Sequence, residues 1–433
     1  MFDLAVYRGR RERLAAQMRS GVAIVATAPE RLRNRDAHFP FRFDSYFHYL
    51  CGFPEPQAVL VLIAGEQVRS YLFCRDKDPE REVWDGFRYG PEAARELFGV
   101  DEAYSIAKLD EMIPKLLADR DALFCDVGED SEWDARLIQW LNAVRAQVRT
   151  GISAPGEIRD IRKIVDEMRL IKDEAELATM RKAAQISAGA HRRAMQVTRP
   201  GRWEYEIEAE LLHEFRVHGA QAPAYTPIVA GGANACVLHY VANNARLNEH
   251  DLLLIDAGCE LDGYASDITR TFPVRGCFDG PQRQIYELVL SAQAAAIAQV
   301  KPGSRWLDPH DAAVKVLVQG FIDFGLCTGS VDGVIESGDY RRFYMHRTGH
   351  WLGMDVHDCG EYKREGEWRT LVPGMVLTVE PGCYVRPADG VPEQFWNIGV
   401  RIEDDAVVTS DGCEIITADA PKSIDDIEAL MRR

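Results

Sequence analysis

The sequence predicts an α+β protein with two domains: an α/β domain at the N-terminus, followed by a pseudo-twofold domain. Three observations lead to this prediction. Short apolar runs alternate with helical segments as far as about Leu170, a pattern typical of an α/β domain. Beyond that point, two similar series of helices and strands each end in an acidic residue. The chain of 433 residues is long enough for two or three domains. We therefore expect the domains to span residues 1–170 and 171–433.

Composition excludes several classes of partner. The formal net charge is -17, which argues against nucleic acid or an anionic membrane as the main partner, because both require a basic surface. The longest apolar runs, such as "AVLVLIAG", are too short to span a bilayer. The N-terminal "MFDLAVYRGRRERLAAQM" predicts an amphipathic helix and lacks the apolar core of a signal peptide. The ten cysteines contain no CxxC pair, which predicts reduced thiols and a cytoplasmic location.

Local patterns define the expected elements of the first domain. The runs "GVAIVATA", "AVLVLIAG", "SYLFC" and "ALFCDVG" have the length and apolar content of buried strands, and "GPEAARELFGV" has the pattern of a helix. This alternation is what we expect of an α/β domain.

The second domain contains a loose internal repeat. Asp173 and Glu176 predict a capping box at the start of a long helix, which we expect to stop at Arg199-Pro200-Gly201. This helix ends in "TRPGRW" and a later one in "VKPGSRW", and each is followed by another helical stretch. The strand after each helix pair delivers an acid, Asp256 in "LLLIDAGC" and Glu380 in "MVLTVEPGC". Two matching halves predict a site between them.

The spacing of four carboxylates predicts a metal site. Asp256 and Asp267 are an odd number of residues apart in "LLLIDAGCELDGYASDITRTF", so a hairpin with an even-numbered loop would place both on one face, opposite or diagonal to each other. Glu380 and Glu403 are also an odd number apart. Four acids gathered in an apolar setting would repel one another unless cations compensated their charge. Two divalent ions would balance that charge.

Alternative assignments remain among the acids near the second hairpin. The run "RIEDD" contains three adjacent acids, Glu403, Asp404 and Asp405, and strand parity is the criterion that selects Glu403. An isolated acid near a strand end is most often a turn residue or a partner of arginine. The prediction therefore depends on the four acids occurring together with nearby histidines.

Those histidines lie in "YMHRTGHWLGMDVHD", at His346, His350 and His357. The spacing of the first two resembles a zinc-protease helix, but Arg347 replaces the glutamate that HExxH requires, and Gly349 weakens a helix. A donor set of carboxylates with an imidazole favours Mn, Co or Fe over a structural zinc site. The other histidines, apart from His239, are expected to be structural or on the surface: His191, His213, His218, His250 and His310.

Five motifs in order carry a family resemblance. The segments "VLHY", "LIDAGCELDGYASDITRTFPV", "HWLGMDVHD", "MVLTVEPGCYV" and "GVRIEDD" closely resemble those of the pita-bread metallopeptidases, and within them the aminopeptidase P family. The segment "DSYFHYLCGFPEPQAVLVL" resembles the N-terminal domain of that family. The resemblance covers nearly the whole chain, with nothing distinctive between about Phe98 and Asp160.

The resemblance implies a pita-bread catalytic domain with two divalent metal ions, Mn(II) first, with Co, Fe or Zn as alternatives. Asp256 would hold one ion, and His350 with Glu380 the other. Asp267 and Glu403 would bridge the two ions.

The resemblance also implies an activity: hydrolysis of an Xaa-Pro bond by a metal-bridging hydroxide, which removes the N-terminal residue from peptides with proline in the second position. The expected catalytic residues are Glu380, as proton acceptor, and His239, His346, His357 and Arg401. Substrate binding is expected from Tyr225 and Tyr384, and from Trp84, which would reach the site of a neighbouring subunit in a homo-oligomer, either a dimer or a tetramer.

Two alternatives stay open at this stage. A prolidase uses the same metals but cleaves Xaa-Pro dipeptides, and the sequence does not identify a group that would cap the dipeptide's carboxylate. A metal-free pita-bread module could serve as a binding or scaffold protein, although such a module would be expected to lose ligands that this chain retains. A methionine aminopeptidase is less favoured, given the large N-terminal domain.

Overall fold

The computed structural model describes residues 3–432. By their internal contacts the residues divide into two compact units, Met1–Met168 and Arg169–Arg433. Among residues 3–432, none of the helices has the length and apolar content that a membrane span requires.

The first unit is built on a six-stranded mixed sheet of order β6-β5-β4-β1-β7-β8. The central strand β1 pairs antiparallel with β4 and parallel with β7. The strands predicted from the four apolar runs are confirmed as β1, β4, β5 and β7, and β4 is buried along its whole length. The sheet consists of β1 (Gly21–Ala26), β4 (Val59–Ala64), β5 (Arg69–Cys74), β6 (Glu102–Ser105), β7 (Ala122–Cys125) and β8 (Glu157–Asp160).

Helices surround this sheet, including the two that the sequence predicts at the N-terminus and in "GPEAARELFGV". A separate short hairpin joins β2 (Leu32–Asn34) to β3 (Ala37–His38). The helices are α1 (Leu4–Met18), α2 (Ser45–Cys51), α3 (Pro79–Asp85), α4 (Gly90–Phe98), α5 (Leu109–Leu117), α6 (Ser131–Arg145) and α7 (Arg162–Leu170).

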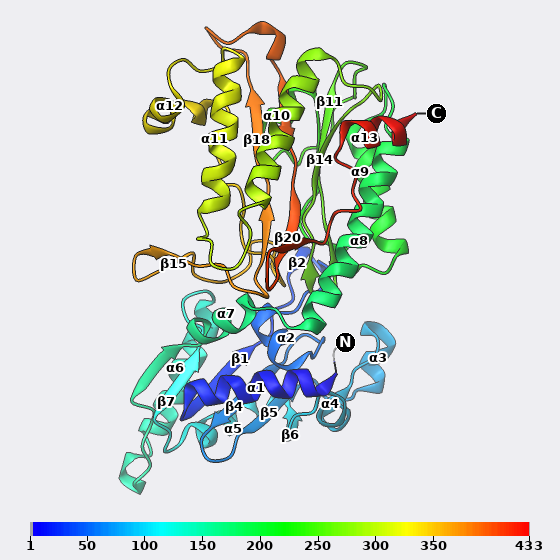
Figure 1. The fold of residues 1–433 in the computed structure, drawn as a ribbon. Coiled ribbons are helices and arrows are strands. Elements are labelled where there is room, and N and C mark those ends of the chain that lie inside the picture. Colours follow the sequence, from blue (N-terminus) through cyan, green and yellow to red (C-terminus); the bar gives the residue numbers. More distant parts are fainter. Residues whose placement is uncertain (1–2, 433) are drawn as a thin grey trace. The chain divides into compact units, whose positions relative to one another are not determined.

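The second unit repeats a pair of helices followed by strands (Figure 1). The predicted capping box is confirmed: Asp173 accepts from the Glu176 N–H, and the Glu176 carboxylate accepts from the Asp173 N–H. The first helix of each pair ends shortly before its Pro-Gly dipeptide, because proline cannot continue the helix. The helices are α8 (Glu174–Val197), α9 (Glu204–Val217), α10 (Gly280–Ile297), α11 (Asp308–Asp323), α12 (Val331–Ser337) and α13 (Ile424–Met431).

Two long antiparallel β-ribbons lie between the helices. We call residues 252–273 the first ribbon; it contains β11 (Leu252–Asp256), β12 (Cys259–Leu261), β13 (Tyr264–Ala265) and β14 (Thr269–Pro273). The second ribbon is formed by β17 (Val376–Val379), β18 (Gly382–Val385), β19 (Ile398–Arg401) and β20 (Asp404–Val408). Edge strands extend both: β9 (Ala222–Pro223), β10 (Ile228–Gly231) and β21 (Cys413–Ile415). A short hairpin, β15 (Lys363–Arg364) and β16 (Glu367–Trp368), lies in the connection before β17.

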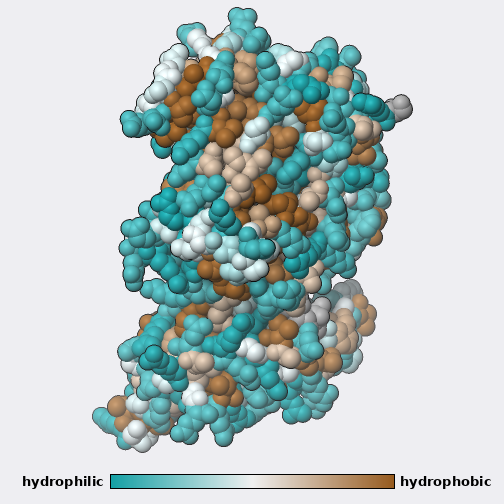
Figure 2. Space-filling view, in the orientation of Figure 1, coloured by the Kyte–Doolittle hydropathy of each residue, from teal (hydrophilic) through white to brown (hydrophobic). Residues whose placement is uncertain are grey.

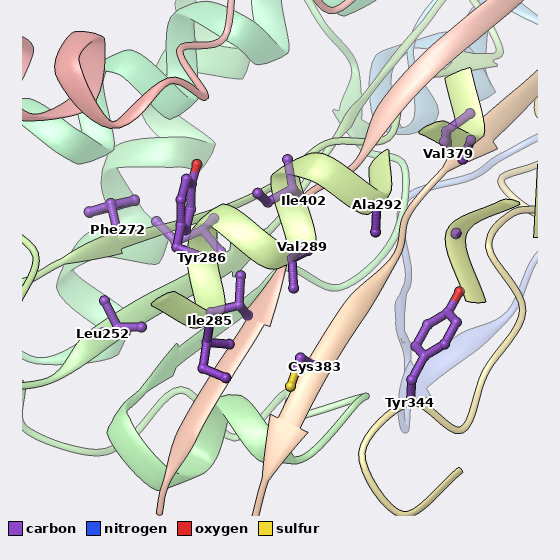
Figure 3. Close-up of a cluster of buried hydrophobic side chains, with 14 of the residues drawn as sticks. Leu252, Phe272, Ile285, Tyr286, Val289, Ala292, Tyr344, Val379, Cys383 and Ile402 are labelled. Carbon is purple, nitrogen blue, oxygen red and sulfur yellow. The ribbon is translucent and has the colours of Figure 1, made fainter. Parts of the chain in front are cut away.

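The core of the second unit is the interface between the helices and the ribbons. Figure 3 shows Ile285 and Val289 of α10 beside strands of the second ribbon, and each of these side chains is fully buried. Burial of one such side chain is worth roughly 1.5–3 kcal/mol. Gln293, one turn further along α10, donates from Nε2 to the carbonyl groups of Val379 and Ile402, at 3.2 Å each. The helix therefore braces the second ribbon beside Glu380 and Glu403.

On the face shown in Figure 2, hydrophilic residues cover most of the surface, with smaller groups of hydrophobic residues between them. Three of the most exposed large hydrophobic side chains belong to α3 and its end: Val83, Trp84 and Phe87. Exposed apolar groups of this kind often mark contacts with other molecules.

Candidate metal centre

The register of the first ribbon places Asp256 and Asp267 on one face. Asp256 pairs with Thr269, and Asp267 precedes Thr269 by two residues, so the two acids are diagonal neighbours. This is one of the two arrangements that the spacing predicts. Gly258 makes it sterically feasible, because a Cβ there would lie 1.6 Å from the carbonyl oxygen of Ser266. Gly258 thus lets the two strands of the ribbon approach each other closely beside Asp267.

The second ribbon places Glu380 and Glu403 opposite each other. The pairs Val379–Asp404 and Gly382–Arg401 belong to one continuous register, interrupted only where Pro381 breaks the ladder. Glu380 and Glu403 occupy that interruption, one on each strand. Opposed residues of an antiparallel pair point to the same face, so both carboxylates face the same side of the ribbon.

The two ribbons and the connection before β17 bring the five predicted ligands together. Ligand atoms of Asp267, His350 and Glu403 lie within 4.8 Å of one another. His350 Nε2 is 3.4 Å from Asp267 Oδ2 and 3.8 Å from Glu380 Oε1. Asp256 joins the group through the hydroxyl of Tyr225, which lies 2.5 Å from Asp256 Oδ1 and also contacts Asp267 Oδ1.

The electrostatics of the cluster indicate an excess of negative charge. Burial, with a contribution from neighbouring carboxylates, raises the pKa of Glu380 to about 7 even though His350 and Arg401 lower it. Burial and the carboxylates around it also raise the pKa of Glu403 well above its usual range. Burial also raises the pKa of Asp267. Burial alone would lower the pKa of His350, but Asp267 and Glu380 raise it to about 9. Each shift reports the cost of gathering these acids away from water.

The donor set fits divalent metal ions. Four carboxylates and one imidazole are oxygen and nitrogen ligands of the kind that Mn, Co, Fe and related ions accept. His350 Nδ1 lies 2.9 Å from the carbonyl oxygen of Trp351, which assigns the proton of the neutral ring to Nδ1 and leaves Nε2 facing the carboxylates. Thr269 donates from Oγ1 to Glu403 Oε2 at 2.6 Å. These contacts orient the donor atoms toward a shared space.

Arg401 links the two ribbons at the edge of the cluster. Its guanidinium donates to Asp256 Oδ2 at 2.6 Å, to the Tyr384 hydroxyl at 3.1 Å and to Thr269 Oγ1 at 3.1 Å. The Tyr384 oxygen lies 2.8 Å from His346 Nε2. Burial, followed by the charge of Arg401, lowers the pKa of His346 to about 3. His346 is therefore neutral near pH 7 and can accept the hydroxyl proton of Tyr384.

The two remaining predicted histidines face solvent. The ring of His357 lies 4.3 Å from that of His350 at an angle of 66°. Burial and the charges of His350 and His239 lower the pKa of His357. His239 is exposed, in the segment after β10. Trp84 belongs to the first unit, where its side chain is 83% exposed, and its contact with a neighbouring subunit stays a prediction.

Strand parity only partly identifies which of the three adjacent acids in "RIEDD" points into the cluster. Asp404 faces away from the cluster, where it accepts from Arg270 at 2.7 Å and from Lys422 at 2.6 Å. Asp405 has the same parity as Glu403, and its Oδ2 accepts the Asp267 N–H at 3.0 Å. Parity therefore excludes Asp404 but does not distinguish Glu403 from Asp405. That distinction depends on how the two ribbons cross.

Sequence reasoning did not identify several residues that hold the proposed ligands in position. His310, expected to be structural or on the surface, has Nδ1 2.8 Å from Thr348 Oγ1, and the carbonyl group of Thr348 accepts the Glu380 N–H at 2.8 Å. Gly349 next to it allows close backbone packing, because a Cβ there would lie 2.1 Å from the Thr378 carbonyl oxygen. Thr269 could have been found by strand periodicity, two residues after Asp267. His310 offered no local signal.

This fold and this cluster define a pita-bread metallopeptidase. The comparison with protein families agrees: the chain belongs to metallopeptidase family M24, whose model matches residues 178–410. Residues 7–124 match the N-terminal domain of aminopeptidase P. The sequence-based prediction of an N-terminal α/β domain followed by a pita-bread domain is therefore confirmed.

Known relatives align over nearly the whole chain. The Xaa-Pro aminopeptidase of Haemophilus influenzae is 48% identical over 427 residues, which cover 98% of this chain and 96% of that protein. The Xaa-Pro aminopeptidase of Escherichia coli is 44% identical over 428 residues, with 98% and 97% covered. Among solved structures, aminopeptidase PepP of Pseudomonas aeruginosa has a TM-score of 0.98 at 49% identity, covering 99% of this chain and 98% of that one. Zinc-substituted Escherichia coli aminopeptidase P in complex with product has a TM-score of 0.97 at 43% identity, with 99% and 98% covered.

Proposed function

We propose that this protein is an Xaa-Pro aminopeptidase, a metal-dependent hydrolase that removes the N-terminal residue from peptides with proline in the second position. The observation that carries the proposal is the buried cluster of four carboxylates and His350 at the crossing of two β-ribbons. Its support is the alignment, over nearly the full chain, with Xaa-Pro aminopeptidases.

The substrate bond requires a dedicated site. An Xaa-Pro bond is a tertiary amide without an N–H, and the proline ring fixes the local backbone. A cleft that recognises an extended backbone through its N–H groups handles such a bond poorly. The cluster offers a different form of recognition, since the free α-amine of a substrate would bind beside a metal ion and the acidic side chains.

We assign two divalent ions to the cluster, Mn(II) first, with Co, Fe or Zn as alternatives. The residues that would hold them are Asp256, Asp267, His350, Glu380 and Glu403. Bound ions of this kind lower the pKa of a water molecule and polarise a carbonyl group. Support for the assignment comes from the raised pKa values of Glu380 and Glu403, which burial causes first and neighbouring carboxylates increase, because bound cations would stabilise the charged form of both acids.

The chain's own side chains would move the protons. Glu380 would accept a proton from the attacking water. We assign to His357 and His239 the stabilisation of the oxyanion that develops on the scissile carbonyl, or proton transfer to the proline nitrogen. Neutral His346, with Tyr384 and Arg401, would bind and orient the substrate. Tyr225 would line the pocket beside Asp256 and Asp267.

Two further inferences concern the state of the protein in the cell. The ten free cysteines, most of them buried, are consistent with a cytoplasmic location. We also propose a homo-oligomer, a dimer or a tetramer, in which exposed Trp84 contacts a neighbouring subunit. Light scattering on the wild type and on Trp84→Ala measures this directly, and an assembly that does not depend on Trp84 would contradict the role of that residue.

Three substrates test the activity after metal removal and reconstitution with Mn(II): an Xaa-Pro dipeptide, an Xaa-Pro-Yaa tripeptide and an Xaa-Ala-Yaa tripeptide. We expect rapid release of the first residue from Xaa-Pro-Yaa, and little cleavage of Xaa-Ala-Yaa. Cleavage confined to the dipeptide would instead identify a prolidase. Failure of the protein to retain stoichiometric metal, together with no hydrolysis, would favour a binding or scaffold module.

A further inference from the structure

The segment that carries His239 alternates between anchored and exposed side chains. We call residues 232–246 the His239 loop. Leu238 and Tyr240 pack against a buried cluster that includes Tyr384. Between and beside them, Val237 and Val241 are 46% and 52% exposed, and His239 also faces solvent. The position of His239 is therefore set by the residues on either side of it.

One buried carboxylate ties this loop together. Glu204 is the first residue of α9, and its side chain has no solvent exposure. Its Oε1 accepts from the Gly231 N–H at 2.8 Å and from Asn234 Nδ2 at 3.0 Å. Its Oε2 accepts from the Tyr240 hydroxyl at 2.8 Å and from the Ala245 N–H at 2.8 Å. The start, the middle and the end of the loop thus converge on a single side chain.

The chemistry of these contacts makes Glu204 difficult to replace. A carboxylate accepts at both oxygens and can satisfy four donors, whereas an amide can accept at only one. Each of these donors is neutral, and the N-terminal end of α9 adds a favourable dipole for a negative charge. Burial, with the hydrogen bond to Glu204, raises the pKa of Tyr240, as expected when the hydroxyl is the donor.

A second contact from the same helix supports the loop. Asn243 is almost fully buried with a positive φ of 45°. It accepts the Val229 N–H at 2.9 Å and donates to the Pro227 carbonyl group at 2.8 Å and to Glu208 Oε2 at 3.0 Å. Glu204 and Glu208 are one turn apart and lie on the same face of α9. The helix face therefore holds the loop at two points.

The His239 loop also packs against a residue of the site. Leu238 and Tyr240 contact the cluster that contains Tyr384, whose hydroxyl accepts from Arg401 Nη1 at 3.1 Å and lies 2.8 Å from His346 Nε2. The carbonyl group of Cys236, at the start of the loop, accepts from Arg386 Nε at 3.1 Å. Arg386 directly follows β18, the strand that carries Tyr384. A shift of the loop would thus move His239 relative to the other groups of the site.

We propose that Glu204 is a positioning residue for the reaction: by binding three parts of the His239 loop, it fixes the position of the His239 imidazole. This inference rests on the proposed function for its catalytic consequence. The anchoring itself rests on the contacts alone.

The first test is Glu204→Gln, which keeps the size of the side chain but turns an amide NH2 toward donors. We expect kcat to fall roughly 10- to 100-fold, the range in which a misplaced catalytic group reduces the rate. KM should change less than kcat, and bound metal should stay at the wild-type ratio. Tyr240→Phe removes a single hydroxyl and should give a smaller loss in the same direction. It keeps the proposal testable if Glu204→Gln folds poorly.

The matched control is Glu206→Gln on the same helix turn. Glu206 caps α9 by accepting the Trp203 N–H at 2.7 Å, and glutamine can accept the same bond. Glu206→Gln therefore removes one negative charge from the first turn of the helix, as Glu204→Gln does, without changing a side chain that binds the His239 loop. We expect near wild-type kcat. An equal loss in Glu206→Gln would show that the effect comes from the helix and would overturn the proposal.

A double-mutant cycle tests whether Glu204 acts through His239. In a His239→Ala background, Glu204→Gln should lower kcat by less than about twofold, because coupled residues are not additive. A full additional loss in that background would contradict the mechanism.

Hydrogen exchange provides a readout that does not require activity. In Glu204→Gln, amides between Gly231 and Ala245 should exchange faster, while those of α8 and the first ribbon stay unchanged. If the wild type fails to cleave Xaa-Pro peptides, the proposed function is wrong, but the exchange measurement still tests the anchor. If the wild type is active and exchange in the loop is unchanged, the anchor is wrong.

Discussion

The guanidinium of Arg401 forms an ion pair with the carboxylate of Asp256, with Nη2 2.6 Å from Oδ2. The pair joins the second ribbon to the first at the edge of the metal centre. Arg401 lies two residues before Glu403, so the arginine and the acid share one face of their strand. The site therefore contains a cation of its own on the Asp256 side, whereas Glu380 and Glu403 face an excess of negative charge.

Because Arg401 is the cation beside Asp256, we expect Arg401→Met to reduce stability more in the metal-free protein than in the metal-bound protein. Without metal, the change removes the cation beside the partly buried Asp256 carboxylate, which keeps its hydrogen bond from the Tyr225 hydroxyl. The loss should cost at most about 3–5 kcal/mol of unfolding free energy. With Mn(II) bound, the cost should be smaller, because the ions supply the missing positive charge. Urea unfolding with and without metal measures both values. An equal loss in the two states would show that Arg401 and the metal do not share the task of neutralising Asp256.

Asp267→Asn should separate metal binding from folding. The amide removes one negative charge and one proposed ligand, so both bound metal and activity should fall by at least about 10-fold, within the range seen when metal sites are perturbed. The metal-free variant should be as stable as the wild type or more stable, since burial disfavours the charge of Asp267. Elemental analysis and thermal unfolding in EDTA provide the two readouts. Wild-type metal content in this variant would remove Asp267 from the ligand set.

The pKa shifts predict opposite pH dependences with and without metal. The folded-state pKa values of Glu380 and His350 are raised to about 7 and about 9 from ordinary values of 4.5 and 6.5. A raised pKa gives stability that is present below the ordinary value and is lost as pH rises through the folded value. The metal-free protein should therefore lose stability between about pH 5 and pH 9.

Metal binding should strengthen over the same pH range, because the ligands must lose their protons. The expected gain is about tenfold in affinity per pH unit for each proton released. Melting temperatures measured at several pH values, in EDTA and in Mn(II), should diverge as pH rises. Parallel curves would mean that these groups do not exchange protons for metal.

The loop that carries His357 has its own anchor, which Lys172→Met would break. Lys172 Nζ is 2.9 Å from Asp358 Oδ2, Arg169 Nη2 is 2.7 Å from Asp358 Oδ1, and all three side chains are buried. Removal of Lys172 leaves Asp358 with Arg169 as its cation, so the loss of stability should be at most about 3–5 kcal/mol. Because Asp358 follows His357 directly, kcat should also fall while metal is retained.

A surface ion pair supplies the control for this prediction. Arg181 and Glu414 pair at 2.7 Å, but their side chains are 35% and 41% exposed. Arg181→Met should therefore cost at most about 1 kcal/mol and leave kcat unchanged. Chemical unfolding and steady-state kinetics on the two variants should separate clearly, and similar losses in both would contradict a specific role for the buried pair.

Patterns local in sequence were sufficient for much of the fold. The capping box at Asp173, the two helix stops at Pro-Gly dipeptides and the buried strands of the first unit all follow from residues within a few positions of one another. The acids Asp256, Asp267, Glu380 and Glu403 were also found this way, because strand parity is a local property. Family resemblance then extended the set to His350.

The remaining features depend on which segments meet in space. Parity could not distinguish Glu403 from Asp405, which lie two residues apart on either side of the start of β20, and only the crossing of the two ribbons separates them. Glu204 carried no signal, because a glutamate at the start of a helix is common and its partners lie as far along the chain as Ala245. The sequence alone determined the faces on which the acids lie. The tertiary structure decided which of them share a site and which side chains hold that site in place, because hydrogen bonds and charges act over a few ångströms, regardless of distance along the chain.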